Sequence, residues 1–413
     1  MTPAAGDEAS LSLYQLLEPA VLADPYPLYR RMRAEDPVHW DSYLHAWVVT
    51  RYEDVVSVLT DFSANRAPSP EFFEALGAPH VSPIAKVMVK QMLFLDAPAH
   101  ARLRKLAAPA FTPTRVRALR HHIQSIATKL IDEIIARGTG QTELLADFAE
   151  PLPAIVTAEM LGVPVEDHRK LKEWSAAFAG MLGNFQHNPD QLDDVFSAVN
   201  GLTTYFEEAV RAHRKHPREG LIQALISSEV DGDRLSDEEI IANCIVTMVG
   251  GQETTTNLIG NGILTLLRNP PQMAKLRANL DIMPAAVEEL LRYESPSQHT
   301  ARLAPEDVLL GAKQIKKRQA VIAVMAAANR DPERFPNPDE LNLERSDNRH
   351  LAFGWAAHFC FGAPLARLEA QIAFKTLLRR FDSLKLISDD VAWRPNLGLR
   401  GLEALPLRYS AKS

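Results

Sequence analysis

The chain has 413 residues, of which 46% are hydrophobic, and its formal net charge is −7. A chain of this length can bury roughly three-quarters of the surface that it exposes when unfolded, so a large hydrophobic core is expected. The acidic balance excludes a global basic field and argues against nucleic acid as a partner.

Cysteine usage and hydropathy indicate where such a chain works. Two cysteines, Cys244 and Cys360, are too few for a disulfide framework and fit a reducing compartment. The segment from Met1 to Leu13 has no basic flank, and no window reaches about 18 uninterrupted apolar residues. We therefore expect a cytoplasmic protein without a signal peptide or membrane anchor.

The N-terminal quarter predicts two helices and a hairpin. A basic helix is expected around 28–34, and runs rich in β-forming residues at 38–40 and 46–50 predict a hairpin. A second helix is expected over 52–60. Residues 66–92 are apolar and interrupted by proline, which indicates a long, partly ordered loop of the kind that serves as a lid or binding wall.

From His100 onward the pattern is mainly helical. The expected helices cover 100–108, 114–137, 147–161, 165–185, 191–215 and 219–229. A capping box at 236–239 opens a helix of about 237–268, which at 1.5 Å per residue is roughly 50 Å long. Short strands follow at 308–310, 314–315 and 320–324. No repeat or linker divides the chain, so we expect one mainly α domain with a small β region over 1–413, without a fused reductase or ferredoxin domain.

The centre of the long helix contradicts its own helical pattern. Gly250 and Gly251 precede Glu253 and Thr254, and each glycine costs about 1 kcal/mol against alanine in a helix. Threonine hydroxyls can also bond back to the preceding turn. Such a conflict marks either a tight crossing with a neighbouring helix or a functional site where an acid and a hydroxyl face a flat ligand.

Cys360 lies in a glycine-containing aromatic loop that leads directly into a helix. A thiol at a helix N-terminus faces the positive end of the helix dipole, which lowers its pKa. Cys360 is therefore a candidate nucleophile or metal ligand, although an isolated cysteine is more often a small buried hydrophobe. The flanking Gly354 and Gly362 allow close approach of a flat or bulky group.

Other charged residues are ambiguous by themselves. Glu289 and Arg292 lie one helical turn apart and form either a solvated pair or a buried one with Arg345 as a further partner. His100 and Arg104 share one helix face and are suited to holding one anionic group, and Arg302 and His358 also lie near turns. Individually, each of these cations is more often an ordinary surface residue.

Together these segments resemble the soluble bacterial cytochromes P-450, the haem-thiolate monooxygenases. The family's cysteine-loop pattern is matched by Phe353, Gly354, Ala356, His358, Cys360 and Gly362. The stretch from Gly251 to Thr255 fits the pattern of the family's long distal helix, and Glu289 to Arg292 fits its Glu-x-x-Arg helix. Segments 96–104 and 328–332 also look like family segments, so the resemblance runs nearly end to end.

The resemblance implies a role for each matched residue. Cys360 would be the axial thiolate ligand of haem b iron, with Phe353 beside it. The haem propionates would be held by His100, Arg104, Arg302 and His358. Glu253 and Thr254 would guide water-borne protons to dioxygen, and Gly250 and Gly251 would leave room for the gas and substrate. Glu289, Arg292 and Arg345 would form a structural group.

The expected function is insertion of one oxygen atom of O2 into a hydrophobic small molecule, such as a terpenoid, steroid, fatty acid or polyketide. Two electrons would come from an external ferredoxin or flavodoxin, and basic residues such as Arg102, Lys105 and Arg115 are candidates for its docking. The alternatives are a peroxide-driven peroxygenase and a non-catalytic haem-binding gas sensor. The intact Glu253–Thr254 pair argues against both.

Two positions depart from the family pattern. Ala356 stands where the second loop glycine usually lies, and a positive φ there would cost an alanine on the order of 1 kcal/mol. The run 316–318 lacks the usual glycine of a β turn and is expected to be an exposed turn. Substrate-pocket walls are expected from 66–92, 176–185, Val246, Val249, 297–300 and 397–399, with Gln298 and His299 as polar anchors.

Overall fold

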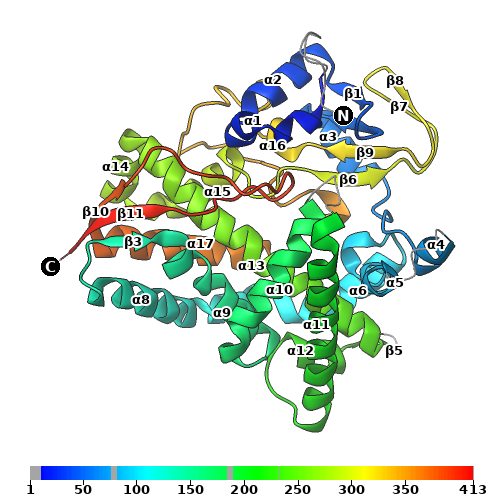
Figure 1. The fold of residues 1–413 in the computed structure, drawn as a ribbon, viewed down its shortest axis with the longest axis horizontal. Coiled ribbons are helices and arrows are strands. Elements are labelled where there is room, and N and C mark those ends of the chain that lie inside the picture. Colours follow the sequence, from blue (N-terminus) through cyan, green and yellow to red (C-terminus); the bar gives the residue numbers. More distant parts are fainter. Residues whose placement is uncertain (1–10, 76–80, 184–188, 231, 413) are drawn as a thin grey trace.

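The long helix α13 (Asp237–Arg268) runs through the middle of the molecule, and the other helices are arranged around it (Figure 1). The computed structural model describes residues 11–75, 81–183, 189–230 and 232–412. Ser236 and Glu239 form the capping box that starts α13, so the predicted helix and its bounds are confirmed. The helices that pack on α13 include α9 (Pro151–Leu161), α10 (His168–Gly183), α11 (Pro189–Lys215) and α17 (Ala363–Arg380).

A four-stranded sheet lies at one end of this helical body, with strand order β1-β2-β9-β6. The predicted hairpin is present, because β1 (Val38–Asp41) pairs antiparallel with β2 (Ala46–Val49). β2 pairs in parallel with β9 (Ala320–Ala323), which pairs antiparallel with β6 (Thr300–Leu303). The sheet therefore joins the N-terminal segment to a strand from the last quarter of the chain.

Most predicted helices are found within a few residues of their expected ends. The remaining α-helices are α1 (Pro19–Ala23), α2 (Tyr26–Glu35), α3 (Tyr52–Asp61), α4 (Pro70–Ala75), α5 (Ser82–Met88), α6 (Ala99–Ala107), α7 (Pro113–Ala118), α8 (Arg120–Ala136), α12 (Leu221–Ser227), α14 (Pro270–Ala278), α15 (Met283–Tyr293) and α16 (Met325–Ala328). Short 3-10 segments lie at Leu13–Leu17, Met92–Phe94, Ala108–Phe111, Val165–Asp167, Leu280–Ile282 and Ala356–His358, and a π-helix at Leu145–Ala149.

Three helical predictions need correction. Residues 66–92 were expected to be a loop, but the structure has α4 and α5 there, each with a proline in its first turn where the missing N–H costs nothing. The helix expected over 114–137 is broken at Leu119 into α7 and α8. The helix expected from 147 begins as a π-helix and becomes α9 only at Pro151. The expected wall at 176–185 extends into residues 184–188, which lie outside the described residues.

The C-terminal strands were not predicted. β10 (Phe381–Leu386) pairs with β11 (Pro406–Ala411), which in turn pairs with β3 (Gln141–Glu143). Two small hairpins complete the β structure: β4 (Glu229–Val230) with β5 (Asp233–Arg234), and β7 (Val308–Leu310) with β8 (Lys313–Ile315). In the turn after β8, Arg318 has φ 67° and so adopts the left-handed conformation that favours glycine. This is the turn in which the usual glycine of the family is absent.

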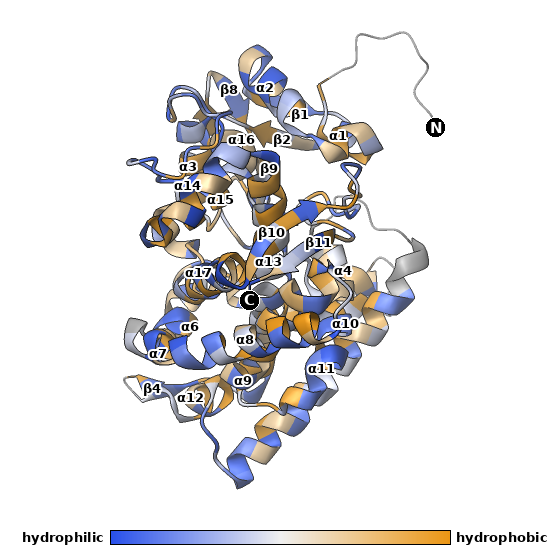
Figure 2. Ribbon diagram, turned by 90° about the vertical axis from the view of Figure 1, so that its left-hand side faces the viewer, coloured by the Kyte–Doolittle hydropathy of each residue, from blue (hydrophilic) through white to orange (hydrophobic). Residues whose placement is uncertain are grey.

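Two large hydrophobic clusters lie along α13. One is built from α8, α13, α15 and α17 and includes Ile263 and Phe374. The other, called here the substrate-side cluster, joins α10 and α11 to α13 and includes Phe178, Ile245 and Val249, with Phe361 packed against it. Figure 2 shows hydrophobic residues concentrated in this interior and hydrophilic residues on the outward turns. Over the residues described, no helix is both long and apolar enough to cross a bilayer.

Candidate functional site

The cysteine loop is closed by its own backbone before it enters α17. The Cys360 amide donates to the Phe353 carbonyl at 2.8 Å, and the Phe359 amide donates to the Ala356 carbonyl at 3.1 Å. Gly354 has φ 72° and Ala356 has φ 53°, so both adopt the left-handed conformation. The positive φ on which the expected cost at Ala356 depended is therefore present.

The environment of Cys360 differs from the sequence-based expectation in one respect. Burial raises the pKa of its thiol, although backbone N–H groups of Gly362 and Ala363 and the nearby Arg104 act in the opposite direction. The predicted lowering by the helix N-terminus is wrong for the protein alone, because desolvation of the thiolate is the larger effect. The residue is nevertheless accessible. A metal ion would supply the charge that keeps such a thiolate ionised, so the site suits a metal ligand better than a free nucleophile.

Cationic side chains predicted from three separate segments meet beside this loop. The rings of His100, from α6, and His358 lie with their centroids 4.0 Å apart. Arg302, from β6, is only 3% exposed. Arg104 donates to the Phe359 carbonyl at 2.7 Å, which places its guanidinium next to the cysteine.

The positive charge of this cluster is carried by Arg104 and Arg302 and is poorly compensated by negative charge. Burial and then the neighbouring cations lower the pKa of His358 to about 3, with Asp96 opposing. Burial lowers the pKa of Arg302 to about 10, and it also lowers that of His100. Asp96 itself is bound by the Ser63 hydroxyl and the Ala64 amide. The cluster is therefore a ready site for an anionic group.

Arg66 belongs to the same cluster and was not predicted from the sequence. Its guanidinium lies 4.7 Å from the centre of the Phe94 ring, and burial and then Arg302 lower its pKa to about 9. Its hydrogen bonds go to the carbonyls of Ala64 and Leu93. The only signal in the sequence was one arginine at the edge of an apolar, proline-interrupted stretch.

The arrangement fits a haem group by the chemistry of its donors. Among the described residues, Nε of the buried Arg302 has no hydrogen-bond partner, which is costly unless a bound acceptor satisfies it. Carboxylates of propionate type would satisfy it and neutralise the surrounding cations. Cys360 would supply the thiolate ligand to the iron. The described parts of the chain contain no group of three or more His, Cys, Asp or Glu side chains that could hold a metal ion.

The two glycines in the middle of α13 have different surroundings, so a side chain is absent at each for a different reason. A Cβ atom at Gly250 would meet nothing within 4 Å, whereas one at Gly251 would lie 2.9 Å from Oγ1 of Thr157 in α9. Gly250 thus leaves open space, but Gly251 is required by the crossing of α13 with α9. The Thr254 hydroxyl donates to the Gly250 carbonyl at 2.8 Å, one turn back along the helix.

Glu253 is held by an ion pair that the sequence did not reveal. Its Oε1 atom accepts from Arg394 at 2.5 Å, and the Glu253 side chain is 12% exposed. Arg394 also pairs with Glu150 at 3.0 Å. The side chains of Glu253 and Thr254 are thus bonded to groups outside the cationic cluster. They lie on the same helix as Val249, which belongs to the substrate-side cluster. Phe361, the residue after Cys360, packs against that cluster.

Behind the loop, the predicted structural group is confirmed. Glu289 and Arg292 are both fully buried and joined by two hydrogen bonds of 2.8 Å. Arg345 is the third member, with Nε 3.1 Å from Glu289. Phe353 lies beneath the Arg367 guanidinium at 4.6 Å, so this aromatic neighbour of the cysteine is fixed by a charge on α17.

Of the two predicted polar anchors, Gln298 has a structural role. Its side chain accepts from the Tyr29 hydroxyl at 3.1 Å and donates to the Ser295 carbonyl at 2.6 Å. Burial lowers the pKa of His299 to about 4, so its ring is neutral at physiological pH.

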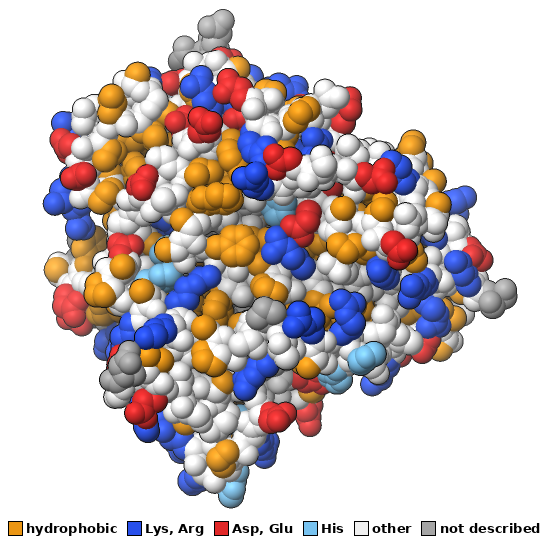
Figure 3. Space-filling view, turned by 180° about the vertical axis from the view of Figure 1, so that it is seen from behind, with side chains coloured by type: hydrophobic (Ala, Val, Ile, Leu, Met, Phe, Trp, Pro, Cys, Tyr) orange, Lys and Arg blue, Asp and Glu red, His pale blue; other side chains and the backbone are white. Residues whose placement is uncertain are grey.

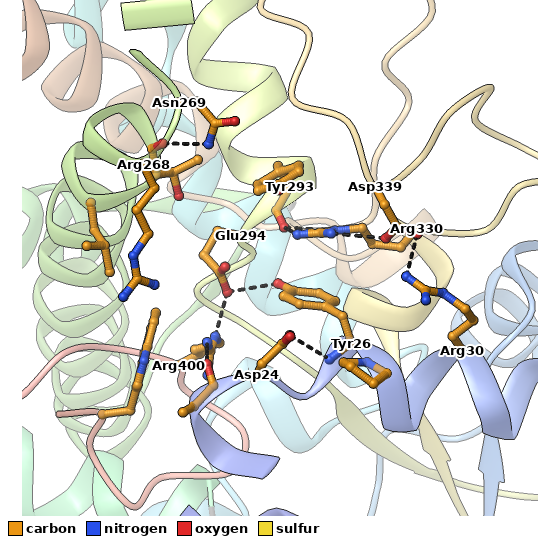
Figure 4. A pocket seen from close by; sticks show the side chains of 15 residues that line it. Asp24, Tyr26, Arg30, Arg268, Asn269, Tyr293, Glu294, Arg330, Asp339 and Arg400 are labelled. Carbon is orange, nitrogen blue, oxygen red and sulfur yellow. Dashed lines mark hydrogen bonds and ion pairs between the residues drawn. The ribbon is translucent and has the colours of Figure 1, made fainter. Parts of the chain in front are cut away.

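A separate polar cavity of about 290 Å³ opens between α1, α2 and the ends of α13 and α15 (Figure 4). The Arg330 guanidinium lies between the rings of Tyr26 and Tyr293, at 3.7 and 3.8 Å. Glu294 accepts from Tyr26 at 2.8 Å and from Arg400 at 2.5 Å. None of the residues predicted to bind haem, oxygen or protons lines this cavity.

Comparisons with known proteins agree with the fold and with the family resemblance of the sequence. The family model described as cytochrome P450 matches residues 45–398. The biotin biosynthesis cytochrome P450 of Bacillus subtilis is 39% identical over 391 residues, 94% of this chain and 97% of that protein. The monooxygenase PikC of Streptomyces venezuelae is 40% identical over 94% of this chain and 91% of its own length.

A solved structure gives the same result. P450BioI in complex with an acyl carrier protein ligated to hexadec-9Z-enoic acid superposes with a TM-score of 0.89 at 38% identity, covering 95% of this chain and 99% of that one. Fold, thiol loop and sequence thus define a haem-thiolate monooxygenase. The chain belongs to the cytochrome P450 family, whose members use haem to incorporate oxygen from O2 into small molecules.

Proposed function

We propose that the protein hydroxylates or epoxidises a hydrophobic small molecule, using O2, haem b and two electrons from an external ferredoxin or flavodoxin in the cytoplasm. The observation that carries this proposal is the placement of Cys360 beside a cluster of two histidines and two arginines, in which the buried Arg302 has an Nε atom without a hydrogen-bond partner among the described residues. The unpaired state of both cysteines is compatible with a reducing compartment.

Each part of the site has its own task in this reaction. Haem, when bound, supplies the activation of dioxygen. Cys360 would be its thiolate ligand, and Arg302 with His100 and His358 would fix its anionic edge. Gly250 keeps one face of α13 open. Thr254 and Glu253 would pass protons inward along that face, from water to the carboxyl group and then toward the hydroxyl.

The acid–hydroxyl pair favours use of O2 over the two alternatives. A peroxide-driven enzyme or a gas sensor needs no proton delivery, whereas Glu253 is fixed by Arg394 and the Thr254 hydroxyl is oriented by the helix. General acid–base groups of this kind contribute typically 10²–10⁴-fold to a rate. Their arrangement would have no use in a protein that only binds a gas.

We propose the substrate class from the chemistry of the side chains that would line the substrate pocket. Phe178, Ile245 and Val249 belong to the substrate-side cluster, and Leu399 packs against it. An apolar surface of this kind suits a fatty acid, steroid, terpenoid or polyketide. The P450BioI structure contains a fatty acid on a carrier protein, so free hexadec-9Z-enoic acid is the first probe to test here.

The redox partner is proposed from charge. Between Asp96 and Asp132 the chain has no acidic residue and seven Lys or Arg residues, although the whole chain has net charge −7. Arg115, Arg117 and Arg120 are exposed on and just after α7. Figure 3 shows Lys and Arg side chains gathered on part of the face that it draws. Arg102, one of the predicted docking residues, is instead engaged by Asp233 and Glu239.

Spectroscopy of the purified holoprotein tests the proposal. The reduced, carbon monoxide-bound protein should show the band typical of thiolate ligation, and Cys360→Ser should abolish it. Hexadec-9Z-enoic acid or testosterone should displace the iron-bound water and shift the main absorption band. Product formed with ferredoxin, reductase and O2, and not with peroxide alone, separates the proposal from the peroxygenase. A histidine-type band would contradict it.

A further inference from the structure

Glu253 belongs to a chain of four charged side chains that leads from α13 to the surface. Arg394 binds Glu253 through one terminal nitrogen at 2.5 Å and Glu150 through the other at 3.0 Å. Glu150, at the start of α9, is also bound by Lys172 of α10. The exposed fractions are 12% for Glu253, 23% for Arg394, 17% for Glu150 and 34% for Lys172, so the most buried member is at the α13 end and the most exposed one at the other end.

Arg394 is carried by a hairpin-like segment of residues 392–402, called here the C-terminal hairpin. Trp393 and Leu402 form an antiparallel bridge, and the Arg394 amide donates to the Gly401 carbonyl at 2.9 Å. These pairs fix the backbone from which the Arg394 side chain extends. The guanidinium at its end is held by its ion pairs with Glu253 and Glu150.

The tip of this hairpin lies on the substrate side. Asn396 accepts from the amides of Gly398 and Leu399 at 3.2 and 2.9 Å, and it donates to the Ala179 carbonyl of α10 at 3.2 Å. Leu399 packs against the substrate-side cluster. The same short segment thus touches both the expected substrate wall and the acid on α13.

The base of the hairpin is anchored in the polar cavity of Figure 4. The Arg400 guanidinium lies 3.4 Å from the centre of the Trp393 ring and pairs with Glu294 at 2.5 Å. It also donates to the carbonyls of Leu22 and Ala23. The base is therefore held on two sides, so the hairpin keeps Arg394 in a defined place between α13 and the substrate-side tip.

We propose that Arg394 is a positioning residue for Glu253 and that the C-terminal hairpin links its position to the substrate side. This inference rests on the proposed monooxygenase function. Arg394 occupies Oε1 of Glu253, so Oε2 is the atom that exchanges protons. A proton from water would bind Oε2 and leave toward the Thr254 hydroxyl, after which the carboxylate takes the next proton; no electrons move in this step.

Substitution of Arg394 in the holoenzyme tests the proposal. We expect Arg394→Gln to lower kcat about 10-fold or more while KM for the probe substrate changes less than 2-fold, because the loss concerns proton delivery. More of the consumed NADPH should then appear as hydrogen peroxide. Arg394→Lys should restore part of kcat. Arg408→Gln, an exposed arginine of β11, is the matched control and should behave as the wild type.

A second measurement needs neither turnover nor a substrate. Urea unfolding of Glu253→Gln, Arg394→Gln and the double variant forms a double-mutant cycle, and the two single effects should be clearly non-additive. Asn396→Ala should increase hydrogen exchange of the hairpin and of α13 near Glu253. Additive effects, or an unchanged kcat in Arg394→Gln, would overturn the inference. The carbon monoxide band would remain in either case, so this failure is distinct from failure of the proposed function.

Discussion

At the residue scale, the cysteine loop places two left-handed residues close together and uses glycine for only one of them. Gly354 has φ 72° and Ala356 has φ 53°. The left-handed region costs an L-residue with a side chain roughly 1–2 kcal/mol. The alanine is tolerated because the Cys360 and Phe359 amides hold the loop in place. The loop therefore retains strain at Ala356 that glycine would remove.

Opposite substitutions at these two positions should have opposite effects. Ala356→Gly relieves the strain but gives the unfolded chain about 0.4–1 kcal/mol more conformational freedom, so we expect a net gain of roughly 0.5 kcal/mol. Gly354→Ala should cost about 1 kcal/mol. Urea unfolding midpoints of the two variants measure this difference. A loss of stability in Ala356→Gly would show that the loop is not strained there.

A second residue-scale feature is a buried carboxyl group on α17. Glu369 is 1% exposed, and burial raises its pKa to about 8. Oε2 of Glu369 has no hydrogen-bond partner within the described part of the chain. An unfolded glutamate titrates near 4.3. Between these values the unfolded state is ionised while the folded state holds its proton, so stability is lost as pH rises from about 4.3 to 8.

Replacing this acid with its neutral amide should remove that pH dependence. We expect Glu369→Gln to raise the free energy of unfolding by roughly 1–3 kcal/mol at pH 7 and by little at pH 4, where the carboxyl group of the wild type is mostly protonated in both states. Denaturant titrations at a series of pH values provide the measurement. A constant difference at every pH would mean that Glu369 does not titrate as described.

At the element scale, the long helix α13 combines two requirements in one short stretch. Gly251 allows α9 to approach, since a Cβ there would lie 2.9 Å from Thr157. Gly250 faces open space, and its carbonyl accepts from Thr254. The sequence allowed two interpretations of the glycine pair, a helix crossing and a functional opening. Gly251 fits the first interpretation and Gly250 fits the second.

Alanine at these two positions separates packing from function. Gly251→Ala should destabilise the protein by about 1–3 kcal/mol through overpacking, and Thr157→Ala should partly rescue it. Gly250→Ala should leave stability unchanged or raise it by up to about 1 kcal/mol, but it should weaken binding of carbon monoxide to the reduced holoprotein. Equal losses of stability in both variants would contradict the assignment.

The sequence predicted this element well and others poorly, for physical reasons. α13 has a capping box and a long apolar pattern, so its bounds follow from local signals. β3, β10 and β11 were missed because short strands are fixed by partners far away in the chain. Arg66 and Arg394 were missed for a similar reason, because their partners come from other segments. Cys360 was singled out from the sequence and stays a predicted ligand, but the balance of burial and N–H groups that sets its pKa requires coordinates.

At the scale of the whole molecule, the charges are unevenly distributed. An acidic chain carries seven Lys or Arg residues and no Asp or Glu between residues 97 and 131. Such a segment attracts an acidic partner and speeds its encounter, and the effect weakens with salt. Among these cations, Arg115 and Arg120 are exposed, whereas Arg102 is engaged in ion pairs. The surface around α7 is therefore the expected docking area.

Charge reversal in this area should impair electron transfer selectively. Arg115→Glu and Arg120→Glu should each raise the ferredoxin KM by roughly 3–10-fold at low salt, which corresponds to about 1 kcal/mol, and the effect should shrink at high salt. Lys317→Glu, in the exposed turn after β8, makes the same charge change elsewhere and should not. Steady-state kinetics with a fixed reductase gives the comparison; an equal rise in all three would reject α7 as the docking surface.

The pairing of β2 with β9 has a consequence for how the chain is made. Trp47 pairs with Val321, so 274 residues separate partners in the same sheet. At a synthesis rate of about 5–20 residues per second, the N-terminal hairpin waits roughly 15–55 s on the ribosome before its partner strand is produced. During that time its apolar edge is available to other chains. The nascent protein should therefore depend on chaperones that bind extended segments, and truncation before β9 should yield an aggregating product rather than a stable fragment.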